Sequence, residues 1–233
     1  GIFRSVFLYA KPAANVDDLW LQTTLLEDNT TGKLKIRLLL SGETESVTLH
    51  CAIDGLMDED LPLSFDGKYH VSPEFIFPNI QPWCHETPNL YHAVLTLTAA
   101  SGEVLEVIPY DIGFRRFELK DGIMLLNGQR LVIHGVNRHE WNPSTGRAIG
   151  MKDMERAMET FRRNHINAVR TCHYPNQTPW YHMCDQSGIY MMDETNLESH
   201  GSWQKLGKIE PSWNVPGSLP QWKDCMLDRA MSM

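Results

Sequence analysis

Apolar and polar residues alternate through the first half of the chain. Residues 33–39, KLKIRLL, set aliphatic side chains against basic ones, and residues 46–53, 90–99 and 103–119 continue in the same period of two. Successive side chains of a β-strand point to opposite faces, so this period is typical of strands with one buried face. The pattern therefore predicts a series of half-buried strands.

Turn sequences separate these runs, and no convincing helical pattern lies between them. The turns include DNTTG at 28–32, SG at 41–42, DG at 66–67 and SG at 101–102. Several short strands joined in this way predict an antiparallel β-sandwich of immunoglobulin-like size for residues 12–117. Residues 1–11 also resemble a strand from the first residue, so we expect them to be the last strand of a preceding β domain in a longer chain.

After Phe117 the pattern changes to strands that alternate with helices. The predicted elements are a strand at 130–137, a helix at 151–164, a strand at 166–171, a short helix at 178–188, a strand at 188–193 and a helix that begins near Leu219. In the first helix, Met154, Met158 and Phe161 lie on one apolar face. In the second, Thr178 is the predicted N-cap and Gly188 lies just past the end.

Alternation of strand and helix predicts parallel strands joined by right-handed crossovers. Three such units are too few for a complete α/β structure, and they suit the opening of a (β/α)8 barrel. The helical pattern is still running at Met233, so we expect the barrel to continue in a longer chain. The predicted fold is multidomain, an immunoglobulin-like β-sandwich followed by the first three β/α units of a TIM barrel at residues 118–233.

Composition and charge narrow the class of protein. Of the 233 residues, 42% are hydrophobic and 21% are charged, which is typical of a globular protein. A net charge of −8 without a long lysine and arginine cluster argues against a nucleic-acid partner. No apolar run approaches the ~18–20 residues of a membrane span. The five cysteines form no CxxC pair, so we expect free buried thiols in a reducing compartment.

Polar side chains follow each of the three predicted parallel strands. The first strand leads into residues 137–140 (NRHE), the second carries Arg170 and His173, and the third leads into residues 193–200 (DETNLESH). The carboxyl ends of parallel strands meet at one rim of a barrel, where active sites are built. A single histidine there is more often a structural hydrogen-bonding group. Three polar clusters in succession indicate a site.

Residues 167–192, NAVRTCHYPNQTPWYHMCDQSGIYMM, resemble the signature of family 2 glycoside hydrolases. The stretches HGVNRHEW at 134–141, DETNLESHG at 193–201 and WCHETPNLY at 83–91 are similar to β-galactosidases of the multidomain bacterial type. β-Glucuronidases and β-mannosidases share the fold and the His-Tyr-Pro signature. The Glu-x-His-Gly sequence that ends at Gly201 favours the galactosidases.

The resemblance implies roles for individual residues. His139 and His173 match the two histidines that contact the sugar and stabilise its transition state, and Arg170 matches the arginine that lies against the nucleophilic carboxylate. Glu198 and His200 match two of the three protein ligands of an active-site Mg²⁺, with Na⁺ as a further candidate ion. Residues 1–11 would then end a sugar-binding β domain.

Other polar residues near the predicted strand ends have plainer interpretations. We expect Asp193 and Glu194 to lie in the barrel interior or to pair with arginine, rather than to act as acid or base. The sequence leaves open whether Glu140 contacts a ligand or has a structural role. Cys172 is expected to be a small packed residue and not a nucleophile. The long segment 202–220, rich in Pro and Gly, is expected to line the rim of the substrate pocket.

Retaining glycosidases need two carboxyl groups about 5–5.5 Å apart, a nucleophile and an acid/base. The resemblance implies that these come from the fourth and seventh barrel strands, so we expect neither among these residues and no activity from them alone. The implied enzyme is a homo-oligomer of the bacterial cytoplasm that hydrolyses terminal non-reducing β-D-galactose residues of β-galactosides. The alternatives are a sister hydrolase of glucuronides or mannosides, and a non-catalytic carbohydrate-binding or assembly module.

Overall fold

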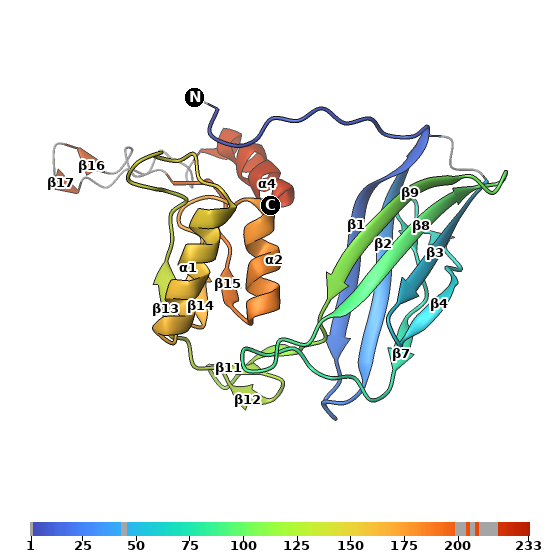
Figure 1. The fold of residues 1–233 in the computed structure, drawn as a ribbon, viewed down its shortest axis with the longest axis horizontal. Helices are drawn as coiled ribbons and strands as arrows, with labels where there is room; N and C mark the ends of the chain where they lie inside the picture. The colour runs from blue at the N-terminus through green and yellow to red at the C-terminus, as the bar shows by residue number, and fades with distance from the viewer. Residues whose placement is uncertain (1, 43–45, 199–203, 206–207, 210–218) are drawn as a thin grey trace. The chain divides into compact units, whose positions relative to one another are not determined.

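The computed structural model describes residues 2–42, 46–198, 204–205, 208–209 and 219–233 (Figure 1). The chain divides into two compact units. One comprises Val6–Val132, and the other combines Gly1–Ser5 with Ile133–Met233. The predicted change of pattern after Phe117 therefore lies inside the first unit.

The first unit contains two antiparallel sheets. One has the order β1-β2-β6-β5, with β7 also paired to β2, and the other has the order β4-β3-β8-β9. The strands are β1 (Ala14–Leu25), β2 (Gly32–Gly42), β3 (Val47–Ile53), β4 (Met57–Asp60), β5 (Ser64–Phe65), β6 (His70–Val71), β7 (Phe75–Phe77), β8 (Tyr91–Ala99) and β9 (Val104–Ile112). The predicted antiparallel sandwich is confirmed.

Alternating side chains from both sheets meet in one core. Leu34, Ile36 and Leu38 of β2 are at most 1% exposed. They belong to the same apolar cluster as Leu49 of β3 and Leu95 of β8. The intervening Lys33, Lys35 and Arg37 lie on the opposite face and are partly or fully exposed, as the period of two requires. Burial of each large aliphatic side chain stabilises the fold by about 1.5–3 kcal/mol.

A small third sheet follows the sandwich in the same unit. It contains β10 (Phe117–Lys120), β11 (Ile123–Leu126) and β12 (Gln129–Arg130), all antiparallel. The side-chain amide of Asn127 donates to the carbonyl oxygen of Trp83 at 3.1 Å, and the guanidinium of Arg116 donates to the carbonyl oxygen of Leu26. These hydrogen bonds attach the small sheet to the sandwich.

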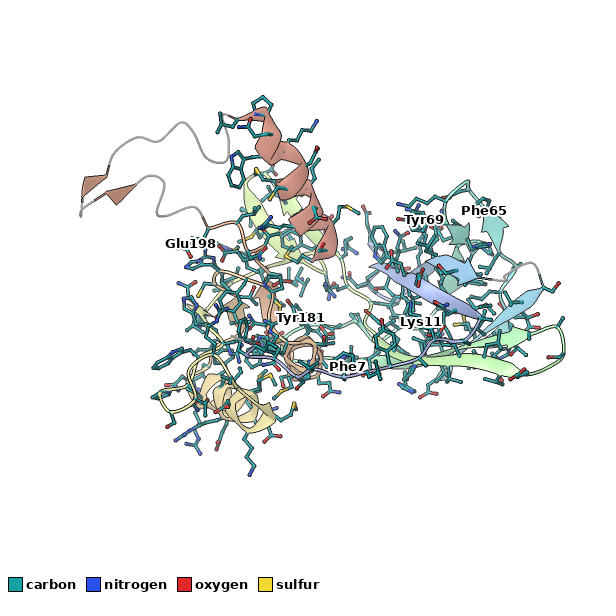
Figure 2. The ribbon with its side chains drawn as sticks, turned by 90° about the horizontal axis from the view of Figure 1, so that it is seen from above. Phe7, Lys11, Phe65, Tyr69, Tyr181 and Glu198 are labelled. Atoms are coloured by element: carbon teal, nitrogen blue, oxygen red, sulfur yellow. The ribbon has the colours of Figure 1, made fainter. Side chains whose placement is uncertain are left out.

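The predicted strand at residues 1–11 is wrong for the described residues. Residues 2–13 have no regular secondary structure, and none of the described strands pairs with them. A strand needs a neighbour for its backbone hydrogen bonds, and the apolar pattern alone does not supply one. Val6, Phe7 and Leu8 are instead 78%, 77% and 100% exposed (Figure 2).

The second unit is built on three parallel strands in the order β13-β14-β15. Its elements are β13 (Gly135–Asn137), α1 (Met151–Arg163), β14 (Ala168–Arg170), α2 (Thr178–Ser187), β15 (Tyr190–Met192), the short hairpin β16 (Gln204–Lys205) and β17 (Lys208–Ile209), the 3-10 turn η1 (Pro220–Trp222) and α4 (Lys223–Ser232). The predicted parallel alternation of strand and helix is confirmed. Met154, Met158 and Phe161 of α1 pack with Val169, Trp180 and Cys184 as its core.

Several element boundaries differ from the prediction. The strand expected at 130–137 is interrupted, because β12 ends at Arg130 and β13 begins at Gly135. The N-cap of α2 is Gln177 in an extended conformation, and Thr178 is already helical, whereas Gly188 ends the helix in the left-handed region as predicted. The last helix begins with the 3-10 turn η1 before α4.

Candidate functional site

The register of the three parallel strands places their carboxyl ends side by side. Asn137 of β13 lies opposite Arg170 of β14, and Arg170 lies opposite Met192 of β15. The polar residues that follow each strand therefore emerge at one edge of the sheet. This confirms the sequence-based expectation that three separate polar stretches meet.

Arg170, His173, Glu194 and His139 form what we call the strand-end cluster. Arg170 Nη2 donates to Glu194 Oε1 at 2.8 Å, and His173 Nδ1 lies 3.1 and 3.3 Å from the two carboxylate oxygens of Glu194. The side chains of Arg170, His173 and Glu194 are 28–35% exposed. Arg170 Nη1 also donates to Asn137 Oδ1 at 3.4 Å. Glu194 is thus paired with an arginine, as predicted.

His139 completes the cluster from the loop after β13. Its ring centroid lies 5.4 Å from that of His173, with the two planes at 77°. His139 Nδ1 lies 3.3 Å from the hydroxyl oxygen of Tyr174, which also accepts the backbone N–H of Glu140 at 3.1 Å. The guanidinium of Arg147 stacks over the Tyr174 ring at 4.3 Å. The two histidines singled out in the sequence are therefore neighbours, and His139 is exposed.

Asp193 has different hydrogen-bond partners from Glu194. Thr171 Oγ1 donates to Asp193 Oδ1 at 2.6 Å, and the hydroxyl of Tyr181 donates to Asp193 Oδ2 at 2.9 Å (Figure 2). Burial, and then the carboxylate of Asp193, raise the pKa of Tyr181 well above its usual value. A neutral hydroxyl donor and a half-buried carboxylate suit an interior structural role, which is one of the two roles predicted for Asp193.

Glu140 has a structural role as well, which settles the alternative left open by its sequence. Its side chain is 2% exposed, and Arg4 Nη2 donates to Oε2 at 2.8 Å. The backbone N–H of Gln177 donates to Oε1 at 2.7 Å. A buried carboxylate is tolerated when such partners satisfy it. Both oxygens are occupied by the protein, so Glu140 holds the N-terminal segment and the start of α2 together.

Arg138 belongs to the polar stretch NRHE noted in the sequence, but no role was predicted for it. Arg138 lies with its guanidinium carbon 3.8 Å from the centroid of the Trp180 ring and donates to the side-chain oxygen of Asn176. Burial lowers the pKa of Arg138. Its position between two predicted site residues in NRHE was the available signal.

Cys172 is packed, as predicted, and is 3% exposed. Its sulfur nevertheless lies close to the histidines of the strand-end cluster. One ligand atom from each of His139, Cys172 and His173 falls within 4.8 Å of the other two. The sequence separates His139 from the other two by more than thirty positions, so only the pairing of β13 with β14 brings them together.

The predicted magnesium ligands are described only in part. Glu198 is an exposed residue that follows β15 (Figure 2), and His200 lies outside the described residues. A carboxylate oxygen is the ligand type that Mg²⁺ prefers, whereas an imidazole is a softer donor. The donor chemistry of Glu198 therefore fits a magnesium site. In the segment 202–220, the structure describes β16, β17 and the residues from Leu219 onward.

Within the residues that the structure describes, none of the helices is both long and apolar enough to span a bilayer.

Two family models match the chain in succession. The model described as glycosyl hydrolases family 2 matches residues 14–115, and the model described as the TIM barrel domain of glycosyl hydrolases family 2 matches residues 117–233.

Sequence relatives cover the whole chain. The β-galactosidase large subunit of Lactobacillus acidophilus is 46% identical over 236 residues, which is 99% of this chain and 37% of that protein. The β-galactosidase of Clostridium acetobutylicum is 46% identical over 238 residues, 100% of this chain and 26% of that protein. The chain thus spans about a quarter to somewhat over a third of these curated relatives.

Solved structures of other proteins have a fold similar to that of this chain. A Ruminococcus gnavus β-glucuronidase in complex with uronic isofagomine has a TM-score of 0.75 at 21% identity, over 95% of this chain and 36% of that chain. A Parabacteroides merdae β-glucuronidase has a TM-score of 0.70 at 22% identity, over 77% of this chain and 23% of that chain. At this identity the likeness concerns the fold alone. From its sandwich domain to the start of its TIM-barrel domain, the chain belongs to family 2 of the glycosyl hydrolases.

Proposed function

We propose that this chain is part of a retaining β-galactosidase that hydrolyses terminal non-reducing β-D-galactose residues. The observation that carries the proposal is the strand-end cluster, in which two histidine rings 5.4 Å apart adjoin the Arg170–Glu194 pair. Identity of 46% to named β-galactosidases over the whole chain favours galactosides over glucuronides or mannosides.

In this proposal the three strand–helix repeats are the first three units of a (β/α)8 barrel at residues 118–233, which follows a sandwich at 12–117. Residues 1–11 would be the end of a preceding sugar-binding β domain. The parallel order β13-β14-β15 supports the assignment, because a barrel places successive strands next to each other.

The two histidines would bind hydroxyl groups of the sugar. Glu194 engages Nδ1 of His173, and Tyr174 engages Nδ1 of His139, so Nε2 is the ring atom directed to a ligand in both. Such prepositioned groups accelerate a reaction when their hydrogen bonds strengthen in the transition state. These partners orient both rings before a substrate binds.

Arg170 would lie against the nucleophilic carboxylate, which belongs to a later barrel strand. A neighbouring guanidinium favours the ionised form of a carboxylate and keeps it nucleophilic at neutral pH. Arg170 is itself held by Glu194 and Asn137, so its position does not depend on the substrate.

None of the three carboxylates near the strand ends is proposed as nucleophile or acid/base. Glu194 is paired with Arg170, Asp193 accepts from Tyr181, and Glu140 accepts from Arg4. A retaining mechanism needs two carboxyl groups about 5–5.5 Å apart on either side of the scissile bond. We therefore assign both to parts of the barrel domain outside these residues.

Glu198 and His200 would hold Mg²⁺, with Na⁺ as a further candidate ion. A bound divalent cation supplies positive charge that shifts the acidity of a neighbouring carboxyl group. The contribution of this chain is the carboxylate of Glu198, a hard oxygen donor. The galactosidase would assemble as a homo-oligomer.

The test is hydrolysis of aryl β-galactoside, β-glucuronide and β-mannoside by the full-length enzyme that carries these residues. We expect the galactoside to have by far the highest kcat/KM. Preference for the glucuronide or the mannoside would replace the proposal with a sister activity. Lack of all three activities in a folded full-length protein would favour a non-catalytic module.

A further inference from the structure

A thiol that the proposed sugar binding does not use lies beside the strand-end cluster. Cys172 is 3% exposed and lies between Arg170 and His173 along the chain. The sulfur of Cys172 and one ring nitrogen each from His139 and His173 lie within 4.8 Å of one another. Two imidazoles and one thiol converge from two neighbouring strand ends, which is more than a packing role for the cysteine requires.

The outer contacts of both histidines suit metal ligation. Ligating histidines usually bond their second ring nitrogen to a carboxylate or another oxygen group, which fixes the ring and the tautomer. His173 Nδ1 lies 3.1 Å from Glu194 Oε1, and His139 Nδ1 lies 3.3 Å from the Tyr174 hydroxyl. Each ring can therefore present Nε2 as a lone-pair donor.

Among the residues that the structure describes, Arg170 is the cation in contact with His173. Its Nη2 lies 3.3 Å from His173 Nδ1 and also donates to Glu194 Oε1 at 2.8 Å. The contact of Nδ1 with the carboxylate is the shorter one, which favours Nδ1 as donor to Glu194. Glu194 also offsets the charge of Arg170, so the guanidinium does not exclude a second cation on the other side of the ring.

The ligand set selects the kind of metal. Nitrogen and sulfur donors suit Zn²⁺ and similar borderline-soft ions, whereas Mg²⁺ prefers oxygen. Tetrahedral zinc with ordinary bond lengths separates its N and S ligands by about 3.3–3.6 Å. The three groups would need to close by about 1 Å, and the exposed His139 ring has room to turn.

We propose that His139, Cys172 and His173 form a site for a borderline-soft divalent cation such as Zn²⁺. On binding, the Cys172 S–H bond breaks, its proton passes to solvent, and the sulfur electron pair forms the bond to the metal. Water fills the fourth position. Its ligands are different residues from those proposed for Mg²⁺, Glu198 and His200.

The experiment is a titration of the chain with Co²⁺, which reports a thiolate ligand by strong near-ultraviolet charge-transfer absorption. We expect one Co²⁺ per chain with this band, and Zn²⁺ should displace it. Cys172→Ser should abolish the band and lower Co²⁺ affinity by more than about tenfold, since loss of an outer partner alone costs 10–100-fold. His139→Gln, at an exposed position, should also lower the affinity without disturbing the fold.

Cys184→Ser is the matched control. Cys184 is 1% exposed and lies in the same unit, in the core formed by α1 and α2. This variant should keep the Co²⁺ spectrum and affinity, and near-ultraviolet circular dichroism should show that all variants are folded. The proposal is overturned if Co²⁺ binds without a thiolate band, or if Cys172→Ser and His139→Gln both bind Co²⁺ like the unsubstituted chain.

A second arm rests on the proposed function. If His139 and His173 also contact galactose, Zn²⁺ should inhibit the full-length galactosidase competitively, and Cys172→Ser should weaken that inhibition by more than about tenfold. A retained cobalt band together with inhibition that galactoside does not relieve would contradict the sugar-binding role of the histidines. Loss of the band would contradict the metal site alone.

Discussion

Charged residues are used differently in the two units of the chain. In the sandwich, ion pairs such as Lys33–Glu74 at 2.7 Å lie on the outer faces. In the second unit, the Glu194 carboxylate accepts from Arg170 and contacts His173, and the backbone N–H of Glu194 donates to the hydroxyl of Thr171. The sandwich is stabilised mainly by the alternating apolar side chains of its strands, which pack in one core. The parallel strands of the second unit gather polar side chains at one edge of their sheet. Substitutions should therefore affect stability in the first unit and chemistry in the second.

The largest effect should come from the sandwich core. Ile36→Ala removes a side chain that is 0% exposed between the two sheets, which should lower the free energy of unfolding by about 2–5 kcal/mol. Lys35→Ala, on the exposed face of the same strand, is the control and should change it by less than about 0.5 kcal/mol. Chemical denaturation measures both. Equal effects of the two substitutions would contradict the alternation.

Substitutions of the two histidines of the strand-end cluster should affect catalysis. His139→Ala and His173→Ala in the full-length enzyme should each lower kcat more than they raise KM, by about 2.7–4 kcal/mol, the cost of losing one well-aimed stabilising group. His182→Ala, at an exposed position of α2, should leave both constants unchanged. Near-normal kinetics for a cluster variant would make that histidine structural.

The elements of the fold could largely be predicted because their signals are local. Alternation predicts the strands of the sandwich, and the helical spacing of Met154 and Phe161 predicts α1. The pairing of Glu194 with an arginine was also within reach, because Arg170 ends β14 and Glu194 follows the neighbouring parallel strand β15. In each case the signal in the sequence is a periodic pattern of residues or the position of a residue at a strand end.

The remainder depends on contacts that no local pattern encodes. Arg4 and Glu140 are 136 positions apart, and nothing in either sequence segment pairs them. Cys172 meets His139 only through the register of β13 with β14. Residues 2–11 have the composition of a strand, but a strand also requires a partner, which composition cannot provide.

Glu140 provides a smaller test within the second unit. Glu140→Gln removes the charge of a 2%-exposed carboxylate that receives Arg4 and the N–H of Gln177, which should lower the free energy of unfolding by about 1–3 kcal/mol. Glu159→Gln breaks an exposed pair with Arg163 one turn away on α1, and such pairs contribute about 0.3–0.5 kcal/mol. Thermal unfolding of the two variants compares a buried partner with an exposed one. If Glu159→Gln lowered the free energy of unfolding more than Glu140→Gln, the greater structural role assigned to the buried Glu140 would be wrong.

The smallest effect concerns a titratable group in the sandwich. His50 of β3 lies with Nε2 2.8 Å from Asp58 Oδ1 and Nδ1 2.9 Å from Asp60 Oδ1, both on β4. The hydrogen bond to Asp58, followed by that to Asp60, raises the pKa of His50 above its usual value. The stabilisation from this contact should be fully present below about pH 6.5, the unfolded pKa, and should be lost as pH rises through the higher folded pKa.

Nuclear magnetic resonance titration of the His50 ring should measure the raised pKa and separate its causes. Asp58→Asn should lower the pKa of His50 more than Asp60→Asn, because Asp58 makes the larger contribution. Glu59→Gln changes the net charge equally but lies opposite Cys51, on the other face of β4, so it should leave the titration nearly unchanged. If Glu59→Gln shifted the pKa of His50 as much as Asp58→Asn, the general charge of the strand would be the cause rather than the hydrogen bond. In the strand-end cluster, side chains from three neighbouring strand ends converge on one edge of the sheet to build a site. In the sandwich, the pleat of a single strand would be enough to separate the carboxylates that raise the pKa of His50 from one that does not.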